Sequence, residues 1–164
     1  MLRDRTNVGR AMAVKPIPEG YHTVTPYMVA NDAQKLIEFA TRAFDAKVLE
    51  AMKREDGTIM HAELQIGDSR IMLGQANEQH KAMPCGIYLY VPDVDTTYKK
   101  AMAAGAVSTM EPANQFYGDR NGGVRDQNGN TWWIGTHVED VSGDEMKRRM
   151  AEEVTRREAA AARA

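Results

Sequence analysis

The sequence lacks the features that mark several large classes of protein. Its single cysteine, Cys85, excludes an internal disulfide and fits a reducing compartment. No apolar run approaches the roughly 20 residues of a membrane-spanning helix, and the stretch from Ala11 to Val14 is too short for a signal peptide. A formal net charge of −2 gives no field that favours nucleic acid. We therefore expect a cytoplasmic protein that binds neither membranes nor nucleic acid.

What the sequence does contain indicates one folded domain. Hydrophobic residues make up 43% of the chain, which is close to the globular average and excludes extensive disorder. A length of 164 residues suffices for one domain with a buried core. We expect a polar N-terminal lead-in over residues 1–20, a single domain over residues 21–140 and a C-terminal helix over residues 141–164.

The domain repeats one pattern of predicted elements. Strand-like runs end at Val29 and Val91, and turn glycines occur at Gly67 and Gly129, so both pairs are 62 positions apart (91 − 29 and 129 − 67). Equal offsets at opposite ends of a unit indicate a duplicated β-α-β-β-β module. The two modules cover residues 21–76 and 84–138. We predict an α+β fold in which two tandem modules form a curled mixed sheet around a cleft, followed by the C-terminal helix.

Alternating side chains and turn residues place the strands. We predict them over residues 22–29, 46–52, 58–66 and 69–74, and again over 86–91, 106–110, 122–126 and 131–137. The pair Asp56-Gly57 predicts a type I′ hairpin turn, because both central positions of that turn need positive φ, and Asn128-Gly129 predicts the last hairpin in the same way. Both pairs therefore mark hairpin turns between neighbouring strands.

Capping residues place the helices. Asn31 with Gln34 three residues later resembles a capping arrangement for the first helix. Asp93 or Asp95 can cap the second helix. Ser142 with Glu145 forms a capping box that opens the C-terminal helix. The predicted helix ends are a left-handed position at Gly105 and the alanine-rich C-terminus.

Alternation along the strands also divides their side chains between a helix-facing set and a cleft-facing set. The predicted cleft-facing set is Thr23, Thr25, Tyr27, His61, Glu63, Gln65, Arg70, Met72, Tyr88, Tyr90, Thr131 and Trp133. Trp132 should turn outward from the cleft. A lining of aromatic rings with a few polar groups is typical of a small-molecule pocket, although Tyr88 and Tyr90 can equally fill the interior of a closed sheet.

Asp119-Arg120 follows Tyr117 in a glycine-rich segment. We interpret this pair as a salt bridge that orders a loop. The alternative is that Arg120 or Arg125 anchors an anionic group of a ligand through a two-pronged contact. The residues expected to bind a ligand are Thr25, Tyr27, Met72, Tyr88, Tyr90, Tyr117, Arg120 and Trp133.

Three stretches resemble the glyoxalase / bleomycin-resistance / extradiol-dioxygenase superfamily, also called vicinal oxygen chelate proteins, and within it the PhnB-like subgroup. They are Thr25-Pro-Tyr-Met-Val-Ala-Asn-Asp-Ala33, Met60-His-Ala-Glu-Leu-Gln-Ile-Gly-Asp68, and Phe116-Tyr-Gly-Asp-Arg120 through Gly129-Asn-Thr-Trp132. With the repeat they cover roughly residues 20–140. The resemblance implies a cleft formed by paired modules, often across a homodimer.

Enzymes of that superfamily usually hold a divalent metal with His and Glu side chains from the first and last strands of each module. Those places correspond to Thr25, Met72, Gly86 and Trp133 in this sequence. None of the four suits a catalytic divalent ion, which prefers imidazole, carboxylate or thiolate donors. The resemblance therefore carries over the fold but no metal site, as in metal-free relatives that sequester a flat ligand between aromatic side chains.

These observations favour a metal-independent small-molecule binding protein that holds an aromatic or amphiphilic ligand in the inter-module cleft, and that forms a homodimer. No cofactor is expected. The alternative is a lyase, isomerase or dioxygenase that uses His61 and Glu63, two residues apart on one strand face, as an acid–base pair or as ligands of a displaced divalent metal. A third possibility is that the fold serves only as an assembly module.

Overall fold

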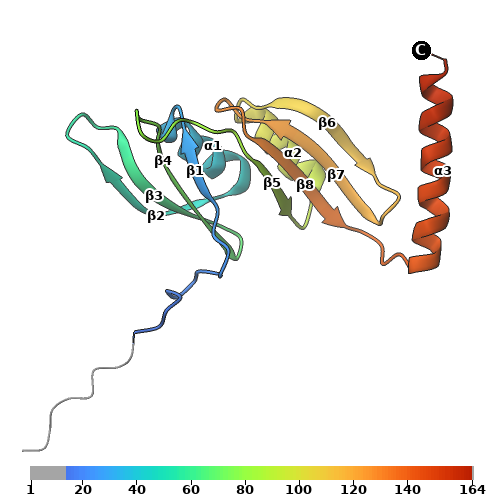
Figure 1. The fold of residues 1–164 in the computed structure, drawn as a ribbon, viewed down its shortest axis with the longest axis horizontal. Coiled ribbons are helices and arrows are strands. Elements are labelled where there is room, and N and C mark those ends of the chain that lie inside the picture. Colours follow the sequence, from blue (N-terminus) through green and yellow to red (C-terminus); the bar gives the residue numbers. More distant parts are fainter. Residues whose placement is uncertain (1–13, 164) are drawn as a thin grey trace, which may run out of the picture.

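A computed structural model describes residues 14–163 and shows two successive βαβββ modules (Figure 1). The first module consists of β1 (Tyr27–Ala30), α1 (Ala33–Phe44), β2 (Lys47–Lys53), β3 (Ile59–Ile66) and β4 (Ser69–Gln75). The second consists of β5 (Gly86–Tyr90), α2 (Val94–Ala103), β6 (Val107–Asn114), β7 (Asp119–Arg125) and β8 (Thr131–His137), and α3 (Gly143–Ala161) follows it. The predicted α+β class, the two modules and the C-terminal helix are confirmed.

Each module forms its own four-stranded mixed sheet. The strand orders are β1-β4-β3-β2 and β5-β8-β7-β6, with one parallel pair in each sheet, β1 with β4 and β5 with β8. Tyr27 lies opposite Met72 in the first parallel pair, and Tyr88 lies opposite Trp133 in the second. Tyr88 and Trp133 are thus the counterparts of Tyr27 and Met72, at a structural offset of 61 residues (88 − 27 and 133 − 72).

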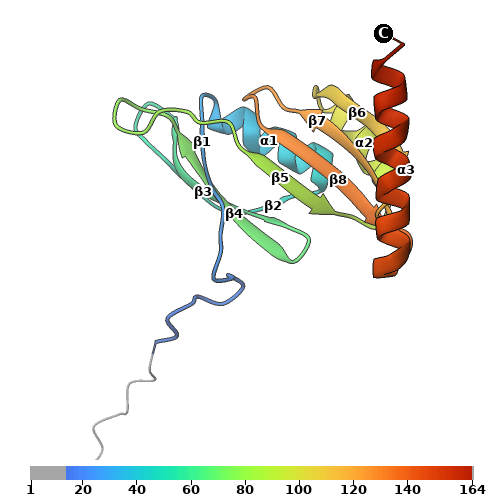
Figure 2. The ribbon, with the colours of Figure 1, turned by 45° about the vertical axis from the view of Figure 1, so that its right-hand side comes forward.

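Helices α1 and α2 lie against one face of the sheets and next to each other (Figures 1 and 2). Their buried apolar side chains pack on alternate strand residues such as Leu64 and Ile134, which are fully buried. Trp132 is also fully buried on this side, so the prediction that it turns away from the cleft is confirmed. The opposite face of each sheet, called its open face below, is not covered by α1 or α2.

The two modules share contacts across their boundary. The ring centroids of Phe44, at the end of α1, and Trp132, in β8, are 4.8 Å apart. The backbone N–H of Asp32 donates to Oδ1 of Asn128 (2.9 Å), and the Asn128 amide donates back to the Asp32 carbonyl (3.0 Å). Lys100 and Asp45 add an ion pair between the modules at 2.7 Å. The helix-side core is therefore continuous from one module to the other.

The predicted start of the first module is wrong in two details. The strand expected over 22–29 is only Tyr27–Ala30, because pairing with β4 begins where the Met72 N–H donates to the Pro26 carbonyl, and proline offers no N–H in return. The cap of α1 is Asp32 rather than Asn31. The Asp32 carboxylate accepts from the Lys35 N–H (3.0 Å), which satisfies one of the unpaired donors of the first helical turn.

The expected type I′ turns are also absent, because only the glycine of each pair has positive φ: 83° at Gly57 and 86° at Gly129. The carboxylates of Asp56 and Asp126 instead accept from backbone N–H groups two residues ahead and hold longer connections. In the second module, β6 extends to Asn114 and β7 begins at Asp119, beyond the predicted limits of 110 and 122. The cap at Asp93 and the left-handed Gly105 (φ 97°) are confirmed.

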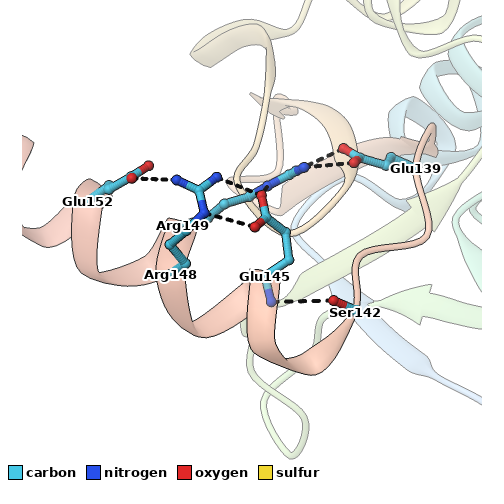
Figure 3. Close-up of polar contacts among 6 residues, drawn as sticks. All are labelled: Glu139, Ser142, Glu145, Arg148, Arg149 and Glu152. Carbon is cyan, nitrogen blue, oxygen red and sulfur yellow. Dashed lines mark hydrogen bonds and ion pairs between the residues drawn. The ribbon is translucent and has the colours of Figure 1, made fainter.

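Helix α3 lies beside the second sheet and buries none of its residues (Figure 1). The Ser142 hydroxyl accepts from the Glu145 N–H at 3.3 Å, which confirms this part of the predicted cap (Figure 3). The Glu145 carboxylate does not return to the cap; it binds Arg148 and Arg149 instead. The guanidinium of Arg149 also makes a two-pronged contact with Glu139, at 2.7 and 2.8 Å, and this fastens the helix to the segment after β8.

None of the helices within residues 14–163 combines the length and the apolar character that a membrane span requires.

Candidate functional site

The structure distributes the predicted site residues over two open faces, because each module forms its own sheet. Thr25, Tyr27, His61, Glu63 and Met72 lie on or beside the first open face. Tyr88, Tyr90, Tyr117 and Trp133 belong to the second. Arg120 is placed apart from both sets. The cavities that these side chains line are therefore separate within one chain.

Two aromatic rings of the second open face lie directly against the backbone of neighbouring strands. A Cβ atom built on Gly135 would be 2.4 Å from the Tyr88 hydroxyl, and one built on Gly86 would be 2.6 Å from the Trp133 ring. Glycine is therefore required at both positions for the rings to lie where they do. Tyr90 packs beside Tyr88 with the ring centroids 5.0 Å apart. The result is an aromatic floor across β5 and β8.

Asp119 connects these tyrosines to a histidine. Its buried carboxylate accepts from the hydroxyls of Tyr88 (3.2 Å) and Tyr90 (2.9 Å) and pairs with Nδ1 of His137 (2.8 Å). Burial opposes the charged carboxylate, but the hydrogen bonds from His137, Tyr90 and Tyr88 outweigh it, so the pKa of Asp119 is lowered. The same contact raises the pKa of His137, with a second contribution from Asp140. Asp119 was not among the sequence-predicted site residues.

The predicted salt bridge between Asp119 and Arg120 is wrong. The two residues are neighbours in β7, so their side chains point to opposite faces of the sheet. The Arg120 guanidinium instead makes a two-pronged ion pair with Asp95 of α2, at 2.7 and 2.8 Å. This contact already occupies the guanidinium edge that the alternative interpretation assigned to a ligand anion.

Asn121 is the second polar residue of this face that the sequence did not single out. Its Nδ2 donates to the hydroxyls of Tyr88 (3.1 Å) and Tyr117 (2.6 Å). Because the Tyr88 hydroxyl donates to the Asp119 carboxylate, which only accepts, Nδ2 rather than Oδ1 of Asn121 must face Tyr88. Burial raises the pKa of Tyr88 to about 12, so this hydroxyl keeps the proton that it donates. Oδ1 of Asn121 is buried and has no hydrogen-bond partner among residues 14–163.

A cavity of about 310 Å³, called the aromatic pocket below, lies over this part of the second open face. It is lined by Tyr88, Met110, Gln115, Phe116, Tyr117, Asn121, Trp133 and Arg157. Tyr88 also lines a groove of about 500 Å³ between the two modules, together with Tyr90 and residues of β4 such as Arg70. The inter-module groove and the aromatic pocket thus share one wall residue, Tyr88.

The first open face carries the predicted acid–base pair. Nε2 of His61 is 3.5 Å from Oε1 of Glu63, and the His61 ring stacks on Tyr27 with the centroids 5.9 Å apart. The nearby Tyr21 hydroxyl stabilises the charged carboxylate and is the largest cause that lowers the pKa of Glu63, and His61 adds to it. Glu63 and Met72 line a cavity of about 480 Å³ whose other wall includes residues 16–18 and 21–23.

The residues at the metal-ligand positions of the superfamily do not fit a metal ion. Thr25 offers one hydroxyl, Met72 a thioether, and Gly86 no side chain at all, while the indole of Trp133 covers the Gly86 backbone. His61 and Glu63 supply two donors. Within residues 14–163, no group of three or more His, Cys, Asp or Glu side chains could hold a metal ion.

The chain belongs to the Glyoxalase/Bleomycin resistance protein/Dioxygenase superfamily, whose family model matches residues 21–134. It is 34% identical over 154 residues to an uncharacterized protein of Mycobacterium tuberculosis (strain H37Rv), a match that covers 87% of this chain and 88% of the relative.

Two solved structures show the same fold. TioX from Micromonospora sp. ML1 has a TM-score of 0.62 at 24% identity, over 70% of this chain and 98% of TioX. TnmS3, an antibiotic binding protein from Streptomyces sp. CB03234, has a TM-score of 0.58 at 18% identity, over 77% of this chain and 99% of TnmS3. These structures confirm the fold, and the family model confirms the superfamily resemblance read from the three sequence motifs.

Proposed function

We propose that this protein binds an aromatic or amphiphilic small molecule without a metal ion, and that the ligand rests on the aromatic floor of the second open face. The observation that carries the proposal is the arrangement of Tyr88 and Trp133. Both rings lie against glycine backbone, and hydrogen bonds fix the Tyr88 hydroxyl. Rings held in this way present flat apolar surface at little cost in side-chain entropy on binding.

The comparisons support this proposal at the level of the superfamily. TnmS3 is an antibiotic binding protein with the same fold. A planar antibiotic matches the flat rings of Tyr88 and Trp133, so such molecules form the first panel to test. The PhnB-like subgroup remains a prediction that rests on the three sequence motifs.

Isothermal titration against a panel of planar antibiotics, with and without a chelator, tests this function. We expect at least one ligand to bind with an affinity that the chelator leaves unchanged. Trp133→Leu should weaken that binding by about tenfold or more, since stacking on an aromatic side chain is worth on the order of 1–3 kcal/mol. Met150→Ala, which alters an exposed apolar residue of α3 outside the aromatic pocket, is the control. Binding abolished by the chelator would contradict the proposal.

We further propose that two copies of the chain pair through their open faces and close the cleft. Large apolar side chains are exposed on both faces: Tyr27, Met52 and Met60 on the first, Tyr88, Tyr90 and Trp133 on the second. Uncovered apolar surface of this kind marks interaction sites. It also explains why the predicted ligand-binding residues fall into two sets, because the first face of one copy would cover the second face of the other.

Sedimentation velocity tests the homodimer. Met52 lies opposite His61 on the first open face, so Met52→Glu places a charge in the proposed interface. We expect the wild-type protein to sediment as a dimer and Met52→Glu to shift it toward the monomer, because an unpaired charge is costly to bury. Val48→Glu is the control, because it places the same charge at an exposed position of β2 that lies opposite the helix-facing Leu64 rather than on the open face. A wild-type monomer at high protein concentration would contradict this proposal.

An enzymatic function built on His61 and Glu63 is the second candidate, supported by their 3.5 Å contact beside a cavity. Because the pKa of Glu63 is lowered, this carboxyl is charged at neutral pH and would act as a base or a ligand rather than as a proton donor. Anomalous X-ray scattering from crystals grown with divalent metals separates the two functions. A bound ion that contacts His61 or Glu63 would favour the enzyme.

A further inference from the structure

The wall of the aromatic pocket includes one side chain from a part of the chain that the family model does not cover. The model matches residues 21–134, whereas α3 begins at Gly143. Arg157 of α3 lines the pocket together with Phe116, Tyr117 and Trp133. Helix α3 therefore adds a charged residue to a pocket whose other walls come from the family domain.

The position of Arg157 follows from the way α3 is fastened. Arg149 makes its two-pronged contact with Glu139, which lies two residues after the end of β8 (Figure 3). Arg149, Glu153 and Arg157 are spaced four residues apart, so they share one side of the helix. The side of α3 that contains the anchor to Glu139 is thus the side that brings Arg157 to the pocket.

The Arg157 guanidinium retains unused donors at this place. Its Nε donates to Oε1 of Glu153 at 2.7 Å, which orients the group. Its two terminal nitrogens, Nη1 and Nη2, make no hydrogen bond to any residue in the described range 14–163. Two parallel N–H donors of a guanidinium match the two oxygens of a carboxylate or a sulfonate.

The charged groups that line the pocket are all positive. Of the described residues that line it, Arg157 is the only one with a charged side chain. The carboxylate of Asp119 is not part of the lining and is already engaged by Tyr88, Tyr90 and His137. Glu153 pairs with Arg157 from outside the lining. Within the described lining, the pocket therefore offers a ligand the free guanidinium donors of Arg157 and no carboxylate, which favours an anionic ligand over a cationic one.

We propose that Arg157 makes the aromatic pocket selective for aromatic anions, which place a planar ring system against Trp133 and a carboxylate or sulfonate against the guanidinium. This inference rests on the proposed function, in which the second open face binds an aromatic molecule, and adds the charge of the ligand to it. Arg157 acts here as a specificity-determining residue contributed by the C-terminal helix.

Two fluorescent probes with one ring skeleton test the inference on the full chain. 8-Anilinonaphthalene-1-sulfonate carries a sulfonate, and N-phenyl-1-naphthylamine is the same molecule without it. We expect the wild-type protein to bind the sulfonate more tightly than the neutral probe. Arg157→Gln should weaken the sulfonate by about fivefold or more and change the neutral probe by less than about twofold. The preference should also decline as salt is added, because the side chain of Arg157 is largely exposed.

Arg156→Gln is the matched control. Arg156 also pairs with Glu153 and is similarly exposed, but it does not line the pocket, so the two variants remove the same charge from adjacent positions. Equal weakening of the sulfonate in both variants, or none in Arg157→Gln, would overturn the inference. Trp133→Leu separates this failure from that of the proposed function. If Trp133→Leu weakens both probes while Arg157→Gln has no selective effect, only the charge selectivity fails; if Trp133→Leu affects neither, the binding face itself is wrong.

Discussion

At the scale of single residues, Asp119 determines how the polar groups of the second open face are arranged. One buried carboxylate receives two tyrosine hydroxyls and a histidine, and the Tyr88 hydroxyl in turn orients the Asn121 amide. Such a network is fixed only while Asp119 is ionised, because a protonated carboxyl would compete with the hydroxyls as a donor. The charge of this one carboxylate therefore stabilises the hydrogen bonds of Tyr88 and Tyr90.

The contact between Asp119 and His137 predicts a pH dependence of stability. The pKa of His137 is raised above its usual 6.5, so its contribution is fully present below about pH 6.5 and is lost as the pH rises through the folded-state value. The pKa of Asp119 is lowered from 3.8, so its contribution is present above about pH 3.8 and is lost at lower pH. We expect the window of greatest stabilisation to lie between these two limits.

Urea unfolding at pH 5.5 and pH 8.5 measures this effect. The wild-type protein should lose stability between the two values, and His137→Gln should lose distinctly less, because glutamine does not titrate. His80→Gln, in the loop before β5, is the control and should keep the wild-type difference. An identical difference in wild type and His137→Gln would show that other groups cause the dependence.

At the scale of elements, α3 differs from every other helix in how it is held. It buries no residue, and a two-pronged ion pair between Arg149 and Glu139 fastens it to the segment after β8. The helix itself is supported by its own ion pairs, among them Glu145 with Arg148 and Arg149 (Figure 3). Exposed ion pairs add little to global stability, so α3 should detach without unfolding the domain.

Glu139→Gln should therefore increase hydrogen exchange throughout residues 143–161 and leave the urea midpoint of the domain unchanged. Glu152→Gln removes an ion pair within α3 but not the anchor to Glu139, and exchange should rise less in this control.

Acid should also increase the hydrogen exchange of α3. Contacts with Arg148 and Arg149 lower the pKa of Glu145 from 4.5 to about 2, so these contacts persist above about pH 4.5 and are lost as the pH falls toward 2. Slow exchange of α3 in Glu139→Gln would refute this anchor.

At the scale of the whole molecule, the two modules depend on one another. Phe44 of the first module contacts Trp132 of the second, and both side chains are buried. Neither sheet would have a complete core on its helix side if the other module were removed. We therefore expect the domain to unfold in one cooperative transition, in spite of its internal repeat.

Phe44→Ala tests this dependence. Removing the ring should lower the free energy of unfolding by about 3–5 kcal/mol, because a large cavity is left in a packed core. Amides of β3 and β8 should lose hydrogen-exchange protection by the same amount, although only one module carries the substitution. Phe116→Ala, at the partly exposed contact with Tyr117, should cost less and serves as the control. Loss of protection confined to the first module would contradict a shared core.

The sequence allowed much of this fold to be predicted, because local signals determine it. Side-chain alternation assigned Trp132 and Trp133 to opposite faces, and the repeat revealed the two modules. The failures have a different cause. The alternating segment 22–26 pairs with no strand in the described part of the chain, so pattern alone overstated the length of the first strand. Asp32 rather than Asn31 caps α1, because the Asp32 carboxylate accepts from the Lys35 N–H. Asn31 and Asp32 can both cap a helix, so the sequence alone does not show which of them does.

The candidate site was less predictable, because its contacts join distant parts of the chain. Tyr88 and Tyr90 meet Asp119 about 30 residues later, and His137 joins them from the last strand. Alternation around Asp119 and Asn121 could have placed both on the open face, had β7 been extended to them. No local pattern connects Arg157, on a helix outside the repeat, with a pocket in the second sheet.

The neighbouring residues Trp132 and Trp133 differ in solvent exposure, so their fluorescence can be distinguished. Trp132 is sealed in the core with its indole N–H bonded to Asp126 at 2.9 Å, whereas 41% of Trp133 is open to solvent. A small collisional quencher such as acrylamide should quench the fluorescence of Trp133 but not that of Trp132. The blue-shifted emission of Trp132 then serves as an internal reference. A ligand that covers Trp133 should reduce this quenching, so binding can be measured without attaching a label.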